Sequence, residues 1–245
     1  DKIAGKLGFA RDSALRAEAG ILYVLHELTD EGHVYYPLEP LLEKCQEILE
    51  IDRTIIAVAL ATIAADGRIV IEEPGLSPAA LRERGPAVYL AGYHLAETHS
   101  AARLQALTGA PRAIRPIDAD RAVPWIQEKL GITLAVKQIE AIRALAGHKM
   151  LVVTGGPGTG KTTIITAMLR LFAGLRAKIL LAAPTGRAAK RMAEATGQEA
   201  KTIHRLLEFS FLKGGFQKNE TDPLDCDLLI VDEASMIDIL LFHHL

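Results

Sequence analysis

The chain has 245 residues, of which 49% are hydrophobic and 24% charged, and its net charge is −2 at pH 7. This is the composition of a globular protein with enough chain to bury a core, and the longest nearly apolar run, Ile55 to Ala65, is too short to span a bilayer, so we expect a cytoplasmic protein that does not bind membranes. The two cysteines, Cys45 and Cys226, stand far apart in apolar settings, which favours buried free thiols over a disulfide or a metal site.

Residues 1–92 are predicted to form a small, mostly helical domain. The spacing of apolar residues predicts helices from Ser13 to Thr29, from Pro37-Leu38 to Leu49, and from Arg53 to Ala65, the last with Asp52 as its N-cap. Two strand-like runs follow at residues 68–72 and 87–90, joined by a turn rich in Pro, Gly and Ser. Three helices followed by a β-hairpin is the order of a winged-helix domain.

The charge of this domain argues against a DNA-reading role. From Asp1 to Gly75 there are 14 acidic and 7 basic residues, and the predicted third helix, residues 53–65, has a single basic residue. A recognition helix needs polar or basic side chains that face the groove, and an acidic surface repels phosphates. We therefore favour the interpretation that this domain is a packing or protein-interaction module, and it is the part of the chain where a protein partner is expected to bind.

Residues 93–132 are predicted to connect this module to a second domain. A helix over residues 91–107 is followed by a connector with Pro116 and Pro124, and then by a short helix over residues 125–130. From Thr133 onward strands and helices alternate, which predicts an α/β domain over residues 133–245.

The stretch from Gly155 to Thr162 matches the phosphate-binding loop pattern GxxxxGK[ST]. An apolar run over residues 149–154 predicts a buried strand before it, and residues 163–172 predict a helix after it. Glycines let main-chain N–H groups surround phosphate oxygens; Lys161 is expected to reach the β- and γ-phosphates, and Thr162 to ligate Mg²⁺. The predicted nucleotide-binding residues are Gly155, Gly156, Pro157, Gly158, Thr159, Gly160, Lys161, Thr162 and Thr163.

A second apolar run, residues 226–231, predicts a strand that ends in Asp232 and Glu233, 71 residues after Lys161. Acidic residues at such a place are often only a helix N-cap. Following a strand and paired with a phosphate loop, they predict the hydrolytic pair instead. Asp232 would hold Mg²⁺ and Glu233 would orient and deprotonate the attacking water.

Several polar residues around these two motifs are further candidates. Gln138 precedes the loop, and its amide can bind an adenine edge. A basic block with 9 basic and 3 acidic residues runs from Arg176 to Lys218, and a strand over residues 178–183 within it is predicted to end at a basic helix. Two interpretations of this block remain open, a solvated helix face and a surface that binds nucleic acid. The candidate DNA contacts are Pro184, Thr185, Arg187, Thr202 and His204.

Together these motifs resemble the RecD-like helicases of superfamily 1, the family of the exodeoxyribonuclease V alpha subunit. The resemblance rests on GGPGTGKTT, APTGRAAKRM, TIHRLLE and LLIVDEASMID, and it runs from about Leu134 to the end of the sequence. With lower specificity, the sequence upstream looks like the N-terminal extension of the free-standing members.

The resemblance implies a RecA-like motor domain of the P-loop NTPase class and an ATP-driven DNA helicase that moves 5′ to 3′ along single-stranded DNA, opens duplex junctions and serves DNA repair or recombination. In that family Gln138 would read adenine, Pro184, Thr185 and Arg187 would contact the DNA backbone, and Lys161 and Glu233 would be catalytic.

The same resemblance predicts what lies outside this sequence. The nucleotide sensor, the second motor domain with its arginine finger and the upstream helix-hairpin-helix repeats are not expected within it. We therefore expect an incomplete motor that holds half of an ATP site and hydrolyses ATP negligibly by itself.

Alternating apolar and polar residues around Lys213 predict a β-hairpin inserted at about residues 207–222. Either it is a surface hairpin that stabilises the domain or, as in the resembling helicases, it is a pin that splits the duplex, with Phe216 stacked on the last base pair. A different function also remains open, that of a regulatory ATPase whose winged-helix module binds a protein partner without unwinding.

Overall fold

The computed structural model describes residues 10, 12–73, 85–111, 117–156 and 158–245. The chain divides into two compact units, one formed by Asp1–His99 with Asp238–Leu240 and the other by Ser100–Ile237 with Leu241–Leu245. Within the described ranges, no helix combines the length and the apolar character needed to cross a membrane.

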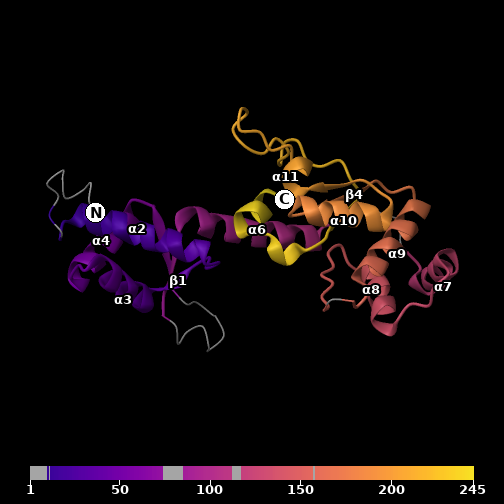
Figure 1. The fold of residues 1–245 in the computed structure, drawn as a ribbon, viewed down its shortest axis with the longest axis horizontal. Helices are drawn as coiled ribbons and strands as arrows, with labels where there is room; N and C mark the ends of the chain where they lie inside the picture. The colour runs from indigo at the N-terminus through magenta and orange to yellow at the C-terminus, as the bar shows by residue number, and fades with distance from the viewer. Residues whose placement is uncertain (1–9, 11, 74–84, 112–116, 157) are drawn as a thin grey trace. The chain divides into compact units, whose positions relative to one another are not determined.

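The first unit has the predicted winged-helix order, which confirms that part of the fold class (Figure 1). Its three short strands form an antiparallel sheet in the order β1-β3-β2, with Tyr36 opposite Val88 and Val70 opposite Tyr89. The edge strand β1 is two residues long, too short for a sequence period to reveal it. The turn predicted between β2 and β3 falls mostly on residues 74–84, outside the described residues. The elements are α2 (Ala14–Asp30), β1 (Tyr36–Pro37), α3 (Leu38–Leu49), α4 (Arg53–Ala65), β2 (Ile69–Glu72), β3 (Ala87–Leu90) and α6 (Ala91–Gly109), which continues into the second unit.

Side-chain caps set the start of two helices in this unit. The Ser13 hydroxyl accepts a hydrogen bond from the Arg16 amide at 3.3 Å, and the Asp52 carboxylate accepts one from the Thr54 amide at 2.8 Å. The apolar faces of α2, α3 and α4 pack into a common core, whose fully buried members include Ile21, Val24, Leu28, Leu41, Cys45, Ile56, Ile63 and Val88.

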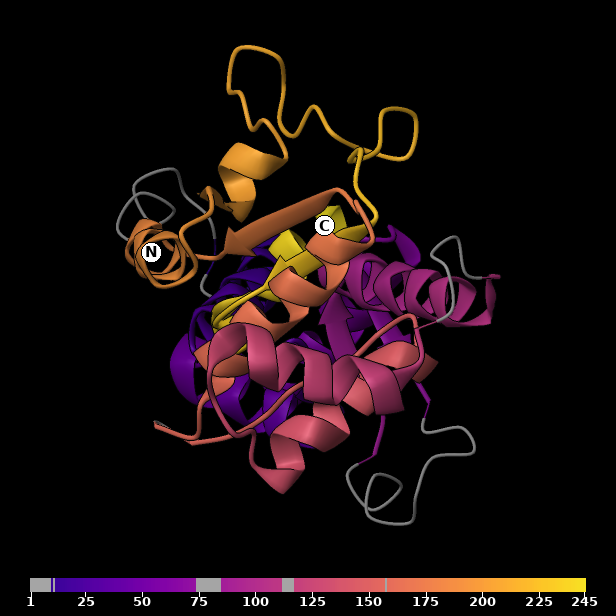
Figure 2. The ribbon, with the colours of Figure 1, turned by 90° about the vertical axis from the view of Figure 1, so that its right-hand side faces the viewer.

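The second unit is an α/β domain around a parallel sheet of order β5-β4-β6 (Figure 2). Leu181 of the central strand lies opposite Ala200 on one side and Ile230 on the other. Helices α7, α8 and α9 share one apolar cluster around Ile126, Ile142 and Phe172. The elements are α7 (Ala119–Leu130), α8 (Val136–Gly147), α9 (Lys161–Gly174), β4 (Ile179–Ala183), α10 (Gly186–Thr196), β5 (Ala200–Thr202), α11 (Ile203–Leu206), β6 (Leu228–Val231), the short η1 (Ala234–Met236) and α12 (Ile239–His244).

Three predictions about the fold of this unit were wrong. Residues 149–154 form no strand and Val152 is 72% exposed, because no described strand pairs with this run. The predicted connector does not reach Pro124, which lies inside α7; the Asp118 carboxylate caps that helix at Asp120 and Arg121. Cys226 is half-buried and not buried, since it precedes β6 at the edge of the sheet.

Candidate functional site

The phosphate-binding loop passes directly into helix α9, as the pattern predicts. Gly160 is the N-cap residue with φ of 81°, and Gly158 has φ of 75°. Both values lie in the left-handed region that side chains disfavour, which explains glycine at these two positions. Thr162 and Thr163 lie in the first turn of α9, at the positive end of the helix dipole. Pro157 lies outside the described residues.

The Lys161 ammonium is held over the loop by main-chain oxygens. Its Nζ donates to the oxygen of Gly155 at 2.6 Å and to that of Gly156 at 2.9 Å. The Thr159 hydroxyl donates to the same Gly156 oxygen at 2.9 Å, which closes the loop on itself. The positive charge is therefore placed where an anion entering the loop would meet it.

Gln138 lies against this loop, although the two are distant in sequence. Its Nε2 donates to the main-chain oxygen of Thr159 over 3.4 Å, and its Oε1 accepts from the amide of Ala135 at 2.9 Å. A Cβ atom on Gly160 would collide with Nε2 of Gln138. The sequence-predicted glutamine is thus brought to the nucleotide loop, so close that its amide would have to move aside for a Cβ atom at position 160.

Asp232 and Glu233 follow the carboxyl end of β6. The Asp232 amide donates to the oxygen of Ala182 on the neighbouring strand at 3.0 Å, which fixes where the strand ends. The Glu233 amide donates to Oδ1 of Asp232 at 2.9 Å, and Glu233 itself has φ of 53°. Asp232 is half-buried and Glu233 is exposed. Among the described residues, no hydrogen bond or ion pair joins either carboxylate to the phosphate loop, whose preceding run is not paired with the sheet.

The predicted DNA contacts share an edge with these carboxylates. Strands β4, β5 and β6 are parallel, so their carboxyl ends meet at one edge of the sheet. Thr185 follows β4 there and accepts from the Ala188 amide at 3.2 Å as N-cap of α10. Thr202 ends β5 and accepts from the Arg205 amide at 3.3 Å as N-cap of α11. Pro184 is half-buried, and Arg187 is exposed on α10.

The predicted insertion contains a minimal hairpin. Ser210 and Gly215 exchange two main-chain hydrogen bonds of 2.9 Å, and the turn between them carries Phe211 and Leu212, which are 89% and 100% exposed. Figure 2 shows the chain after α11 leaving the sheet as long loops above β4. The exposed residues thus lie at the turn, near the centre of the segment that the sequence predicted as a hairpin.

The expectation that Phe216 is exposed for stacking on DNA was wrong. Its ring is half-buried and packs against His204 with centroids 5.5 Å apart, against Phe209 at 4.9 Å and against His244 at 4.6 Å. Residues of α12 thus cover one face of the hairpin base. His204, a candidate DNA contact, is a member of the same cluster and is exposed at its rim.

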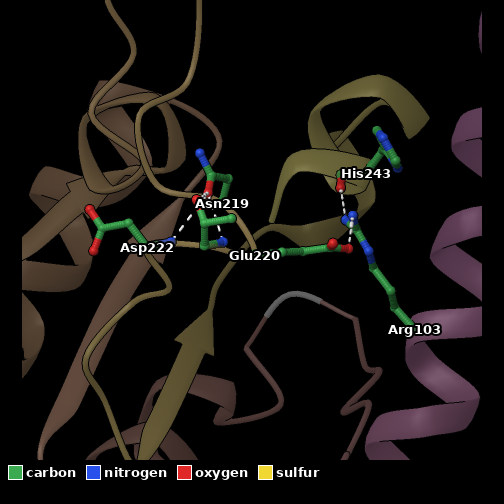
Figure 3. Close-up of polar contacts among 6 residues, drawn as sticks. Arg103, Asn219, Glu220, Asp222 and His243 are labelled. Carbon is green, nitrogen blue, oxygen red and sulfur yellow. Dashed lines mark hydrogen bonds and ion pairs between the residues drawn. The ribbon is translucent and has the colours of Figure 1, made fainter.

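Sequence reasoning missed the role of Arg103 on α6. Its guanidinium donates to the main-chain oxygen of His243 at 2.7 Å and to the Glu220 carboxylate at 2.5 Å (Figure 3). Beside this contact the Asn219 side chain accepts from the amides of Thr221 and Asp222, which fixes the turn after the hairpin. A lone arginine on a helix gives no sequence signal of such a contact.

Comparison with known proteins bears on both units. A family model described as an AAA domain matches residues 138–245, and a model described as the ATP-dependent RecD2 DNA helicase HHH domain matches residues 1–35. The chain is 34% identical to the ATP-dependent RecD2 DNA helicase of Deinococcus radiodurans over 239 residues, which is 97% of this chain and 33% of that protein. The predicted resemblance to the RecD-like helicases is confirmed.

Two RecBCD subunits are also similar to this RecD-like chain. The RecBCD enzyme subunit RecD of Mycolicibacterium smegmatis is 34% identical over 186 residues, 66% of this chain and 32% of that protein. That of Haemophilus influenzae is 38% identical over 112 residues, 36% of this chain and 18% of that protein. The chain spans about a third of the length of the first two relatives. The expectation that helix-hairpin-helix sequence is missing was wrong, because the HHH model matches the first residues.

Proposed function

We propose that this chain is part of an ATP-dependent DNA helicase that moves 5′ to 3′ along single-stranded DNA and opens duplex junctions during repair or recombination. It would supply the phosphate loop, the carboxylate pair and part of the DNA-binding surface. Because DNA is the proposed substrate, the proposed compartment is the cytoplasm. The observation that carries the proposal is the loop itself, in which Lys161 is held by two main-chain oxygens with Gln138 at its side.

The residues at this loop fit ATP and Mg²⁺. Glycines with φ in the left-handed region let a loop turn its main-chain amides toward an anion, and Lys161 adds a positive charge to this loop. When bound, Mg²⁺ neutralises charge on the phosphates and aligns them for attack by water. Thr162 and Asp232 are the proposed ligands of that ion.

Each residue of the site has a distinct proposed task. Lys161 would exchange its hydrogen bonds to Gly155 and Gly156 for phosphate oxygens and stabilise the charge that develops during transfer. Glu233, exposed at the end of β6, would accept a proton from the attacking water. Gln138 would recognise the adenine edge.

The proposed DNA surface is the edge at the carboxyl ends of β4 and β5. Thr185 and Thr202 are both N-caps, so each hydroxyl accepts from its helix and retains a proton to donate to a phosphate oxygen. Pro184, Arg187 and His204 complete the proposed set. The hairpin would act as the wedge, with Phe211 in place of Phe216 as the ring that meets the last base pair.

One feature favours the rival function, a regulatory ATPase that binds a protein partner without unwinding. Helix α4, at the position of a recognition helix, has Arg53 as its single basic residue, and that side chain is ion-paired with Glu39. A DNA-stimulated rate of ATP hydrolysis with strand separation would decide for the helicase. A rate that DNA does not change would decide for the rival.

The decisive experiment uses the intact protein and two variants. Lys161→Ala is expected to abolish ATP hydrolysis, and Glu233→Gln is expected to retain ATP binding and lose turnover by about a thousandfold or more. Lys149→Ala, which changes an exposed lysine outside the loop, is the matched control. Unwinding is compared on duplexes with a 5′ or a 3′ single-stranded tail, and only the former should be opened. Near-normal turnover by Glu233→Gln would refute its role, and equal opening of both duplexes would refute the direction.

A further inference from the structure

A cavity of about 360 Å³ lies beside the edge strand β1 of the first unit. It is lined by the segment from Gly32 to Pro37 and by Glu97 of α6, all within that unit. None of these residues takes part in the proposed nucleotide site or DNA surface. Its size falls at the lower end of the range of small-ligand pockets, about 300–1,000 Å³, which suits one side chain more than a large cofactor.

Aromatic rings gather at this cavity. The Tyr35 ring, which lines it, is tilted by 37° against Tyr89 with centroids 5.4 Å apart, and Tyr89 meets His94 edge-on at 5.1 Å. His33 and Tyr36, also in the lining, form a T-shaped pair at 5.3 Å. Ring faces carry negative electrostatic potential, so such a group attracts cations.

Carboxylates add formal negative charge to the same place. Glu97 lines the cavity, and the pKa of the buried Tyr89 is raised, first by burial and then by the charges of Glu97 and Glu72. Glu72 lies 3.9 Å from Nε2 of His94. One of these rings already contacts a cation within the unit, because Nζ of Lys44 lies over the Tyr36 ring at 5.9 Å from its centroid.

We propose that this cavity binds an arginine or lysine side chain from a basic segment of a partner protein. Tyr35 would receive the cation on its ring face and Glu97 would pair with its charge. The surrounding surface favours a basic peptide over nucleic acid, because residues 12–73 and 85–99 carry 14 acidic and 4 basic residues. The site is independent of the proposed helicase function, so either proposal can fail without the other.

The test measures binding of a fluorescein-labelled peptide of alternating Arg and Gly residues to the intact protein by fluorescence anisotropy. A second peptide carries citrulline in place of arginine, which keeps the shape and removes the charge. Glu97→Gln is expected to weaken binding of the arginine peptide by about fivefold or more, and Tyr35→Leu by about threefold or more. The control Glu47→Gln removes an exposed carboxylate of α3 outside the cavity and should change binding by less than about twofold. Thermal unfolding of each variant checks that the unit remains folded.

Three results would overturn the proposal. Equal losses for Glu97→Gln and Glu47→Gln would show general charge attraction without a site. Equal binding of the citrulline peptide would exclude recognition of a cation. Competition by single-stranded DNA that the Tyr35 and Glu97 variants abolish would assign the cavity to nucleic acid.

Discussion

The side-chain amide of Gln138 joins the first residues of α8 to the phosphate loop, with Nε2 donating to the oxygen of Thr159 and Oε1 accepting from Ala135. One side chain thus caps a helix and supports the loop that carries Lys161. A residue expected only to select the base therefore has a structural task as well.

Replacing Gln138 should affect both tasks. In the intact protein, Gln138→Ala is expected to raise the KM for ATP by about fivefold or more and to reduce discrimination against GTP, because the amide proposed to read adenine, which also contacts the loop, is lost. Steady-state kinetics with both nucleotides measure this. Gln198→Ala, an exposed glutamine of the same unit, is the control. Unchanged KM and selectivity would contradict both tasks.

Mutations at the turn of the hairpin and at its base should have different effects. Phe211 and Leu212 are exposed, so replacing both by Ala should leave the melting temperature and the DNA-stimulated ATPase nearly unchanged while slowing unwinding by about tenfold or more. Phe216→Ala should instead lower the free energy of unfolding by about 1–3 kcal/mol, because a partly buried ring is removed.

Calorimetry and a strand-separation assay distinguish these effects. If the variant with Phe211 and Leu212 replaced by Ala unwinds DNA normally, the hairpin only stabilises its domain. If it loses ATPase and unwinding together, the wedge role also fails.

Arg103 should matter for local order more than for stability. Arg103→Met removes an exposed ion pair with Glu220, so the free energy of unfolding is expected to fall by no more than about 1 kcal/mol. The turn at residues 219–222 also loses its tether to α6, so amide hydrogen exchange there should become faster. Lys137→Met, which removes the exposed pair with Glu140, is the control and should leave this turn unchanged. Unchanged exchange at the turn in Arg103→Met would show that the tether does not order it.

The two thiols should differ in reactivity. Burial raises the pKa of Cys45 from 9.0 to about 12, whereas Cys226 is half-buried and its pKa is raised by burial and by the charges of Asp227 and Asp225. At pH 8 iodoacetamide is therefore expected to label Cys226 before Cys45, and Cys45 only on unfolding. Mass spectrometry of the labelled peptides measures the order, and faster labelling of Cys45 would contradict its burial.

The Cys45 shift also predicts a dependence of stability on pH. The folded state holds this proton more tightly than the unfolded chain, whose thiol ionises near 9.0. The stability linked to Cys45 is thus fully present below pH 9.0 and is lost as the pH rises toward about 12. Chemical unfolding of Cys45→Ala at pH 8 and pH 10 should show a smaller fall in stability than the unchanged protein. An equal fall in both would contradict the linkage.

Local features of the fold were predictable from the sequence, because local chemistry sets them. Asp52 and Ser13 mark helix starts through hydrogen bonds to residues two or three positions away, and the glycines of the phosphate loop specify their own backbone. The loop, its helix and the strand before Asp232 follow from such signals.

Features that depend on distant partners were not predictable. The apolar run at residues 149–154 has strand-like composition, but a strand exists only where a neighbour pairs with it, and no described strand pairs with this run. The alternation of apolar and polar residues predicted the hairpin, but it did not reveal which aromatic ring is covered. His244, far along the chain, packs on Phe216, whereas Phe211 remains exposed to solvent.

The backbone at Glu233 carries a cost that a glycine would avoid. A left-handed φ of 53° at a residue with a Cβ atom is unfavourable by about 1–2 kcal/mol. Glycine at this position would therefore yield a more heat-resistant protein that has lost the proposed base. The gain in stability would thus come at the expense of the residue proposed to activate water. Engineering that aims to stabilise this domain should leave the position untouched.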